Sequence, residues 1–211
     1  MRKKPCETFA RQWALIIPSR IPPASDWVKQ FIHLIPRSEK GHVIDLACGS
    51  GRHSLYAIEQ GYKVLAIDFK TDPILELKSN LSPDLQNQLE VLALDLEQPE
   101  FPLFKNGLFI QGIIVTNYLN RPHFQRILDL LVPGGIFIHE TFAVGNEQFG
   151  KPSNPAFLLQ KDELWQYIQS RNDFSVVSFE QGYLDKPKPA MIQRICAVKQ
   201  NIIGLQLRNE N

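Results

Sequence analysis

Glycine and aspartate residues in the first half of the chain have the types and spacing of a nucleotide-binding site. Gly49 and Gly51 lie between a predicted strand and a predicted helix, where residues without side chains let the backbone turn tightly and approach a bound group. Asp68 ends the second predicted strand, 17 residues after Gly51, in a place to accept both hydroxyls of a ribose. Asp95 ends the third predicted strand, where a carboxylate can accept a hydrogen bond from an adenine amino group. Because carboxyl ends of parallel strands share one edge of a sheet, we expect these residues to face one crevice.

A second group of polar residues follows the fourth and fifth predicted strands. Asn117 and Tyr118 come after the fourth strand, and His139 and Glu140 end the fifth. We interpret Tyr118 as a wall of a substrate pocket and Glu140 as a carboxylate facing the crevice. His139 is a candidate base, although a histidine within a strand is more often buried in the core. Tyr118, His139 and Glu140 are therefore the candidate catalytic residues.

The elements that must position these residues alternate between strand and helix. Ser25 is placed to cap a helix over 26–35, which Pro36 ends. Short continuous apolar runs predict strands buried on both faces, as in a parallel sheet covered by helices. The expected strands are 43–47, 64–67, 89–94, 108–115 and 136–140, and the expected helices between them are 52–59, 73–79 and 122–131.

The last third of the chain has a different pattern. After a predicted helix over 162–170, two β-rich segments follow at 174–179 and 191–198. Only 182–190 separates them, which is too short for a helical crossover, so we expect an antiparallel hairpin. The fold class is α/β, a Rossmann-like sheet with helices on both faces and an antiparallel hairpin strand at its C-terminal side.

The same pattern suggests how the chain is divided. Residues 1–40 are interpreted as a proline-containing lead-in and a helix packed on the domain, 41–200 as the domain itself, and 201–211 as a tail. The segment 142–157 lacks periodicity and follows the fifth strand directly. A loop of this length inside a compact domain is usually functional, and we favour a lid that covers the bound substrate.

Composition narrows the function classes. The 211 residues include 23 basic and 22 acidic side chains, without the basic excess typical of a dedicated nucleic-acid binder. The three cysteines are not spaced for a metal site, and we expect no metal. No apolar run approaches the length of a membrane span, so we expect no membrane partner and a cytoplasmic location.

Two segments resemble the class I S-adenosylmethionine-dependent methyltransferases. They are Val43-Ile44-Asp45-Leu46-Ala47-Cys48-Gly49-Ser50-Gly51-Arg52-His53 and Val64-Leu65-Ala66-Ile67-Asp68, with 131–138 similar to the approach to the fifth strand of that family. Within the family, the Gly-Arg-His-Ser run and Glu140-Thr141-Phe142 are most similar to the tellurite-resistance-like, small-molecule members and to uncharacterised bacterial members. The resemblance implies a seven-stranded sheet, S-adenosylmethionine as cofactor and transfer of its methyl group to an acceptor. A small-molecule acceptor is favoured, and an RNA or protein acceptor stays open.

Carried over residue by residue, the resemblance implies a set of cofactor contacts. Asp45, Gly49 and Gly51 would line the methionine end of the cofactor, Asp68 would hold the ribose, and Asp95 with Leu96 would flank the adenine. Ala47 stands where many members have a first glycine, which keeps the small size that the turn needs. We also assign to the cofactor side His53 at the helix start, Phe69 after Asp68, and Asn117.

Two other classes of function are open to a sequence of this kind. A non-catalytic S-adenosylmethionine-binding subunit of a partner enzyme would keep Asp68 and Asp95. An NAD-dependent oxidoreductase is disfavoured, because Ser54 occupies the third glycine position of G-x-G-x-x-G and no Tyr-x-x-x-Lys pair occurs.

Overall fold

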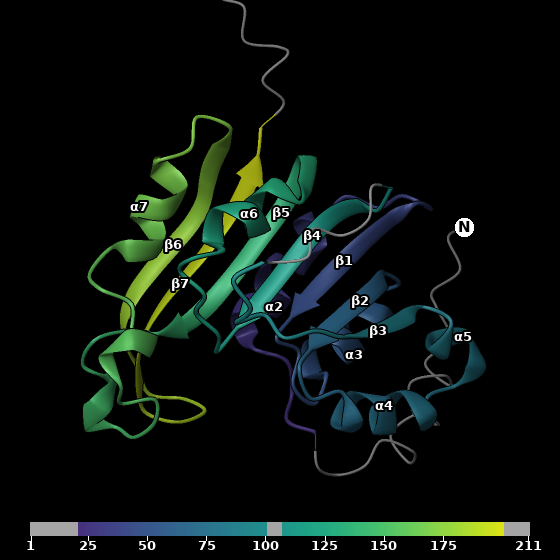
Figure 1. The fold of residues 1–211 in the computed structure, drawn as a ribbon, viewed down its shortest axis with the longest axis horizontal. Coiled ribbons are helices and arrows are strands. Elements are labelled where there is room, and N and C mark those ends of the chain that lie inside the picture. Colours follow the sequence, from purple (N-terminus) through teal and green to yellow (C-terminus); the bar gives the residue numbers. More distant parts are fainter. Residues whose placement is uncertain (1–20, 101–106, 201–211) are drawn as a thin grey trace, which may run out of the picture.

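The computed structural model describes residues 21–100 and 107–200, which form one seven-stranded sheet with helices against it (Figure 1). The strand order is β3-β2-β1-β4-β5-β7-β6. The pairs among the first five strands in this order are parallel, and β7 runs antiparallel to both β5 and β6. The predicted hairpin and the predicted sheet are therefore confirmed.

The elements follow the order that the sequence predicts. The strands are β1 Gly41–Leu46, β2 Lys63–Asp68, β3 Leu89–Ala93, β4 Phe109–Thr116, β5 Leu131–Phe142, β6 Phe174–Leu184 and β7 Ala190–Lys199. The helices are α2 Asp26–Phe31, α3 Arg52–Glu59, α4 Asp72–Ser79, α5 Pro83–Gln86, α6 Phe124–Asp129 and α7 Glu163–Gln169. Ser25 caps α2 as predicted, because its hydroxyl accepts a hydrogen bond from the Val28 backbone N–H.

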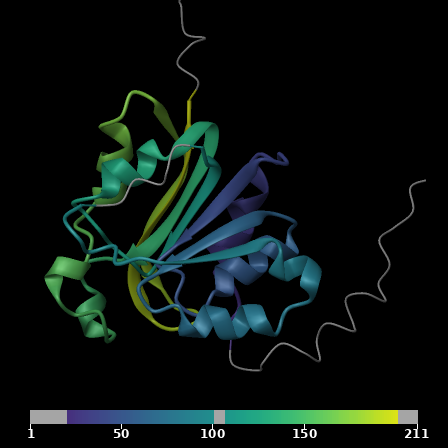
Figure 2. The same cartoon turned by 45° about the vertical axis from the view of Figure 1, so that its right-hand side comes forward.

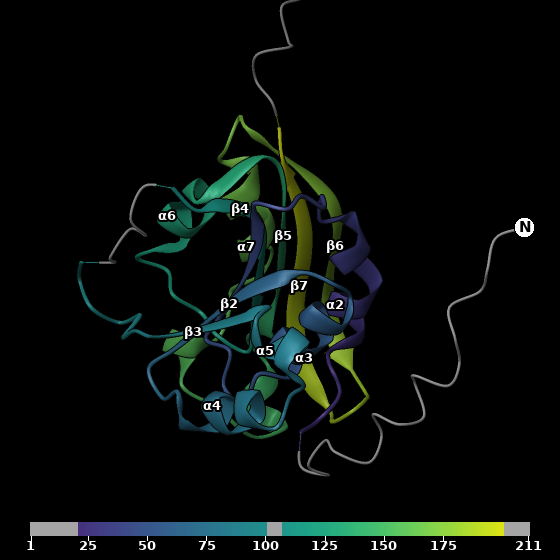
Figure 3. The ribbon, with the colours of Figure 1, turned by 90° about the vertical axis from the view of Figure 1, so that its right-hand side faces the viewer.

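Alternating side chains of the strands build two cores, one on each face of the sheet. Ile136 and Ile138 of β5 point into a core with Trp27 of α2, Leu55 of α3 and Ile74 of α4. Phe137 of β5 belongs to the opposite core, with Phe124 and Leu128 of α6 and with Leu164 and Ile168 of α7. Turned views show α6 on one side of β5 and α2 on the other (Figures 2 and 3). Helices thus cover both faces, as predicted.

The largest differences from the sequence-based expectation lie around β5. The helix expected over 122–131 spans only Phe124–Asp129, and β5 begins at Leu131 rather than at Ile136. Leu131 pairs with Ile110, and the register of the ladder shifts before Gly112 pairs with Ile136. The Pro133-Gly134-Gly135 run therefore lies within the strand at an irregularity of the ladder, although such a run usually marks a turn.

Smaller elements also differ from the expectation. The helix predicted over 26–35 is α-helical only to Phe31 and continues as a 3₁₀ turn, Ile32–Leu34. The short helix α5 is not predicted by the sequence pattern, and β6 and β7 are longer than the predicted strands. The predicted lead-in before residue 21 and the tail from 201 lie outside the described residues. Across the described ranges, 21–100 and 107–200, no helix is long and apolar enough to cross a membrane.

The 142–157 loop is more ordered than its composition suggests. It contains two 3₁₀ turns, Asn146–Gln148 and Pro155–Phe157. A parallel bridge between Ala143 and Leu159 closes its base. The buried Asn146 side chain donates to the Pro152 carbonyl and accepts from the Met191 N–H, at 3.0 and 3.2 Å, which fixes the start of the loop against β7. The loop therefore has a fixed base and an exposed middle.

Candidate functional site

The turn between β1 and α3 depends on residues in the left-handed region. Ala47, Gly49 and Gly51 have φ values of 55°, 55° and 80°. A left-handed conformation costs a residue with a Cβ roughly 1–2 kcal/mol, so Ala47 carries strain that a glycine would avoid. The turn is held by a 3.0 Å hydrogen bond from the Cys48 N–H to the Ile67 carbonyl and a 2.9 Å bond from the Gly51 N–H to the Cys48 carbonyl.

The two glycines have different surroundings. A Cβ added at Gly51 would lie 2.8 Å from Ile74 Cδ1 and 2.9 Å from Leu77 Cδ2, so Gly51 lets α4 pack closely against the turn. A Cβ added at Gly49 would meet nothing within 4 Å, and Gly49 is exposed. The backbone at Gly49 therefore faces open space at the carboxyl edge of the sheet.

Asp68 lies at the end of β2, directly beside this turn. Its Oδ2 accepts from the Gly49 N–H at 2.8 Å, and its Oδ1 accepts from the Lys70 N–H at 2.9 Å. A carboxylate has about four lone-pair sites, so two remain for further donors on this half-exposed side chain. Phe69, the next residue, has an exposed fraction of 67%. A donor-rich group with a flat ring would fit this surface.

Asp45 lies under the turn and not on its surface. Its side chain is 1% exposed, and its Oδ2 accepts a 2.6 Å hydrogen bond from Ser54 Oγ of α3. Burial raises the pKa of Asp45 to about 6, although the Ser54 hydrogen bonds and Arg52 oppose the rise. The carboxylate faces the first turn of α3, so its contact to any bound group runs through the turn that it supports.

Asp95 and Leu96 follow β3, next in space after β2. Asp95 Oδ1 accepts from the Glu97 N–H at 3.0 Å and Oδ2 from Gln98 Nε2 at 2.7 Å. The Gln98 bond first, and then the Glu97 bond, hold the pKa of Asp95 below its usual value. Leu96 is 5% exposed and belongs to the core on the α6 side. The turn, Asp68 and Asp95 thus end or follow three adjacent parallel strands, as the sequence predicts.

His53, assigned to the cofactor side from the sequence, is a buried side chain at the second residue of α3. The Ser25 N–H donates to its Nε2 at 3.2 Å, which leaves the ring hydrogen on Nδ1, 3.1 Å from Thr116 Oγ1 of β4. Burial lowers the pKa of His53 to about 3, so the ring is neutral. Its observed contacts join the start of α2, α3 and β4.

The two candidate residues after β4 differ in exposure: the Asn117 side chain is exposed, and the Tyr118 side chain is half-buried and hydrogen-bonded. Asn117 has a φ of 55° and an exposed side chain, and its N–H donates to the Glu140 carbonyl at 2.9 Å. Tyr118 is half-buried, and its hydroxyl donates to Glu97 Oε1 at 2.6 Å. Burial, and then the bond to Glu97, raise the pKa of the Tyr118 hydroxyl. Tyr118 therefore contacts the segment after β3, where the adenine-side candidates lie.

His139 and Glu140 point to opposite faces of β5. His139 is 2% exposed and packs against the rings of Phe124 and Phe137, and its Nε2 lies 3.0 Å from the Tyr118 carbonyl. Within the described residues its Nδ1 has no hydrogen-bond partner, and burial lowers its pKa to about 4. The ring supports the turn at Tyr118 from inside the core, as is usual for a histidine within a buried strand.

Glu140 belongs to a polar row that the sequence pattern alone does not reveal. Thr116, Glu140, Arg194 and Glu180 are register neighbours on β4, β5, β7 and β6, so their side chains share one face of the sheet. Arg194 Nη1 lies 3.3 Å from Glu140 Oε2 and its Nη2 lies 2.6 Å from Glu180 Oε2. The guanidinium carbon is 4.7 Å from the Trp27 ring centroid. The one signal in the sequence was the single arginine within the otherwise mostly apolar predicted strand 191–198, which indicates a partner of opposite charge on a neighbouring strand.

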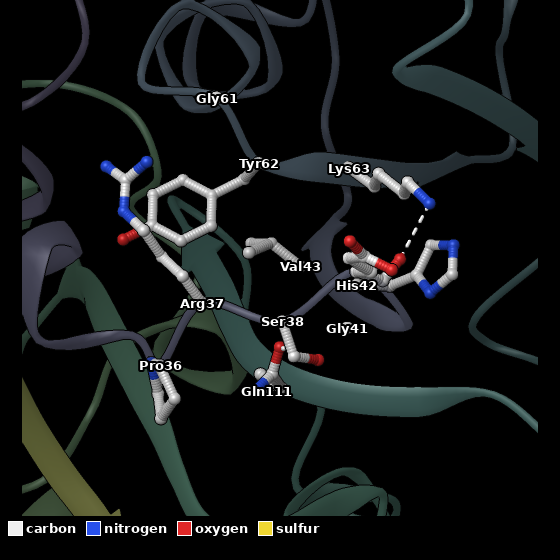
Figure 4. A pocket seen from close by; sticks show the side chains of 11 residues that line it. Pro36, Arg37, Ser38, Gly41, His42, Val43, Gly61, Tyr62, Lys63 and Gln111 are labelled. Atoms are coloured by element: carbon white, nitrogen blue, oxygen red, sulfur yellow. Dashed lines mark hydrogen bonds between the residues drawn. The ribbon is translucent and has the colours of Figure 1, made fainter.

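Two of the cavities among the described residues lie away from the β1–α3 turn. One, of about 360 Å³, is lined by Arg37, Tyr62, Lys63 and Gln111 among others, at the amino ends of β1 and β2 (Figure 4). Figure 4 shows Arg37 beside the Tyr62 ring. The Lys63 ammonium donates a hydrogen bond to the Glu39 carbonyl at 2.7 Å. The other, of about 440 Å³, lies between the base of the 142–157 loop and β7. Neither is lined by Gly49 or Asp68, and concave size alone does not identify a site.

The sheet order, the reversed β7 and the glycine turn with carboxylates at the next two strands define a class of protein. This is the architecture of the class I S-adenosylmethionine-dependent methyltransferases, and the resemblance found in the sequence is confirmed. Residues 26–187 match the family described as "Tellurite resistance protein TehB". The chain belongs to that family.

Individual relatives are distant in sequence. "Putative methyltransferase YqeM" of Bacillus subtilis is 27% identical over 169 residues, which are 74% of this chain and 64% of the relative. This chain thus spans less than two thirds of that relative's length. The structure of TehB from Haemophilus influenzae has a TM-score of 0.61 and 20% identity, covering 91% of this chain and 66% of that one. A Burkholderia thailandensis 1,6-didemethyltoxoflavin-N1-methyltransferase, with bound 1,6-didemethyltoxoflavin and S-adenosylhomocysteine, has a TM-score of 0.58 and 19% identity, covering 83% and 76%.

Proposed function

We propose that this protein binds S-adenosylmethionine at the carboxyl edge of β1, β2 and β3 and methylates a small-molecule acceptor. The observation that carries the proposal is the pairing of an exposed, side-chain-free backbone at Gly49 with the Asp68 carboxylate 2.8 Å away. Bound S-adenosylmethionine supplies an activated methyl group on a positively charged sulfur, so the protein mainly has to bind and align.

Each candidate residue has a distinct task in this proposal. The open backbone at Gly49 admits the amino-acid end of the cofactor, and Asp45 and His53 support that turn from below. Asp68 accepts the ribose hydroxyls through its two remaining lone-pair sites. Phe69, Asp95 and Leu96 border the adenine. Ala47 and Asn117, both in the left-handed region, keep the two flanking turns short.

On the acceptor side we propose that the molecule enters over the ends of β4 and β5. Glu140 lies there with 12% of its side chain exposed, and Arg194 holds it in place. A carboxylate so placed can accept a proton from the acceptor. Tyr118 borders this entrance, and His139 acts through the Tyr118 carbonyl. The small size of the acceptor is supported by the solved relative that holds 1,6-didemethyltoxoflavin. A cytoplasmic location is supported by the free, buried thiols of Cys48 and Cys196.

Binding measurements on two aspartate variants test the cofactor site. Charge-assisted hydrogen bonds contribute roughly 1.5–3 kcal/mol each, so Asp68→Ala should weaken binding of S-adenosylhomocysteine by at least about tenfold. Asp84→Ala is the matched control, because Asp84 is exposed on α5. Titration calorimetry should show micromolar-range binding to the parent and no binding of NAD. Equal affinity of the parent and Asp68→Ala would contradict the placement of the ribose.

The acceptor class needs a separate assay. The parent protein, methyl-labelled S-adenosylmethionine and cell extract are combined, with the small-molecule, RNA and protein fractions offered in separate reactions. We expect label in the small-molecule fraction. Label in RNA or protein alone would overturn the acceptor class, and cofactor binding without transfer to any fraction would favour a non-catalytic binding subunit.

A further inference from the structure

Side-chain hydrogen bonds join the segment after β3 to the segment after β4. The Tyr118 hydroxyl donates to Glu97 Oε1 at 2.6 Å, and Asn120 Nδ2 donates to the Leu96 carbonyl at 2.7 Å. His123 Nε2 lies 2.8 Å from the Gln98 carbonyl. Three consecutive residues after β3, 96–98, are thus each held by a residue of 118–123. The two segments are far apart in sequence, so the contact is tertiary.

Asn120 is at the centre of this network. It is 6% exposed and uses both ends of its amide. Nδ2 donates to the Leu96 carbonyl and, at 3.0 Å, to the Tyr118 hydroxyl, and Oδ1 accepts from the His123 N–H at 2.9 Å. A side chain that offered only acceptors would face the Leu96 carbonyl oxygen with a second oxygen. The position therefore needs an amide.

The same network reaches β5. His139 Nε2 is 3.0 Å from the Tyr118 carbonyl, and the Asn117 N–H donates to the Glu140 carbonyl. The turn at 117–118 is consequently fixed to the strand that carries Glu140 on one side and to the 95–98 segment on the other. In the proposed function these two sides contact different molecules, the acceptor and the adenine.

We propose that Asn120 is a positioning residue that couples the adenine side of the site to the acceptor side. This inference rests on the proposed function. Through its bonds to the Leu96 carbonyl and the Tyr118 hydroxyl, it sets the place of 95–98 relative to 117–118. Binding of the cofactor against 95–98 then also orders the turn that borders the acceptor, and the effect is reciprocal because coupling between two binding equilibria is symmetric.

The experiment replaces the Asn120 amide by a group of the same shape. Asn120→Asp keeps the acceptor for the His123 N–H and loses the donor to Leu96 and Tyr118. The matched control is Asn146→Asp, a buried asparagine that also donates to a carbonyl and accepts from a backbone N–H, in the 142–157 loop. We expect both variants to lose melting temperature at pH 8. Only Asn120→Asp should bind S-adenosylhomocysteine more weakly, by roughly tenfold, as expected for loss of about 1.4 kcal/mol.

A pH series and a second variant strengthen the test. A buried aspartate has a raised pKa, and once protonated it donates again, so the deficit of Asn120→Asp relative to the parent should shrink from pH 8 to pH 5.5. Tyr118→Phe keeps the ring and removes the bond to Glu97. It should weaken binding severalfold and raise the acceptor KM, and its effect should be less than additive with Asn120→Asp because both act on one network.

The outcomes distinguish failure of the proposed function from failure of the proposed role of Asn120. If the parent does not bind S-adenosylhomocysteine, the proposed function fails. If the parent binds and Asn120→Asp binds as tightly, or if Asn146→Asp weakens binding equally, Asn120 has no positioning role. Should Asn120→Asp not fold, Tyr118→Phe alone decides: unchanged affinity overturns the coupling.

Discussion

At the scale of single residues, Asp45 combines a strong sequence signal with an unfavourable position. The carboxylate is buried under the glycine turn with one side-chain donor, Ser54 Oγ, and its pKa rises to about 6 because burial disfavours the charge. At neutral pH the folded protein therefore holds a charged group at a position that favours the neutral form. The charge on Asp45 therefore lowers the folding stability at neutral pH.

Replacing this charge should change how stability depends on pH. The pKa of Asp45 is higher in the folded than in the unfolded chain, so its favourable contribution is complete below about pH 4 and is lost as the pH rises through about 6. At 1.36 kcal/mol per pKa unit the loss is about 3 kcal/mol. In Asp45→Asn the side-chain oxygen still accepts from Ser54 and the charge is absent.

Denaturant unfolding of the parent and Asp45→Asn at pH 4, 5.5 and 7.5 measures the difference. The variant should gain stability relative to the parent as the pH rises, by about 2.4 kcal/mol across the series, because part of the loss is already present at pH 4. The comparison is between the two proteins at each pH, because His53 and His139, whose pKa values are lowered to about 3 and about 4, change stability in the opposite sense. A constant difference across the series would show that Asp45 does not titrate with a raised pKa.

At the scale of elements, the β1–α3 turn contains two glycines with different roles. Gly51 allows close packing against α4, and Gly49 keeps the surface of the turn open. Gly51 packs against Ile74 and Leu77 of α4, whereas Gly49 faces open space. A methyl group at Gly51 would meet α4 side chains at 2.8–2.9 Å, and one at Gly49 would project toward the proposed cofactor site. The same substitution should therefore have different consequences at the two positions.

Gly51→Ala should mainly destabilise the protein, and Gly49→Ala should mainly weaken cofactor binding. The left-handed φ costs alanine roughly 1–2 kcal/mol at either position, and crowding against α4 adds roughly 1–3 kcal/mol at Gly51 alone. Thermal melts and calorimetry with S-adenosylhomocysteine on both variants test this. Gly49→Ala should show the larger loss of affinity of the two variants, and Gly51→Ala the larger loss of melting temperature. An equal loss of affinity in both variants would argue against the open space above Gly49 as the binding surface.

At the scale of the whole molecule, the 142–157 loop lies beyond the end of β5 with a fixed base. The Val144 N–H bonds the Leu159 carbonyl and the Leu159 N–H bonds the Phe142 carbonyl, both at 2.9 Å. Arg121, from the segment after β4, donates to the Leu158 carbonyl and forms an ion pair with Glu163 at the start of α7. Any closing motion must therefore involve the middle of the loop, between these anchors.

Hydrogen exchange should reveal this division of the loop. The amides of Val144 and Leu159 should exchange slowly with or without ligand, because their bonds belong to the base. The amides of Lys151 and Ser153 should exchange fast without ligand and slow in the presence of S-adenosylhomocysteine and the acceptor fraction that supports turnover. Asn172, exposed in the turn before β6, is the internal control. Fast exchange at Lys151 under all conditions would leave the loop as a connection and not a lid.

The sequence by itself determined the class of fold and the candidate cofactor-side residues. Apolar runs and glycine turns are local, so local patterns indicate the existence and order of the strands, the α3 helix and the terminal hairpin. Asp68 and Asp95 could be assigned to one edge, because carboxyl ends of parallel strands always share an edge. The predicted start of β5 was wrong because Pro133-Gly134-Gly135 is a turn signal locally and a strand irregularity in the ladder.

Only the tertiary structure decided which polar groups meet. Arg194 is 54 positions from Glu140, and they are neighbours because β7 inserts between β5 and β6 in a particular register. Asn120 meets the Leu96 carbonyl only when the segments after β3 and β4 lie side by side. Asp45 and His53 belong to the motif shared with the family, yet both side chains are buried. Asp45 lies under α3 and bonds Ser54 of that helix, and His53 lies on the side of α3 that contacts Ser25 and Thr116. Such contacts depend on register and packing between distant segments, and no pattern within one segment encodes them.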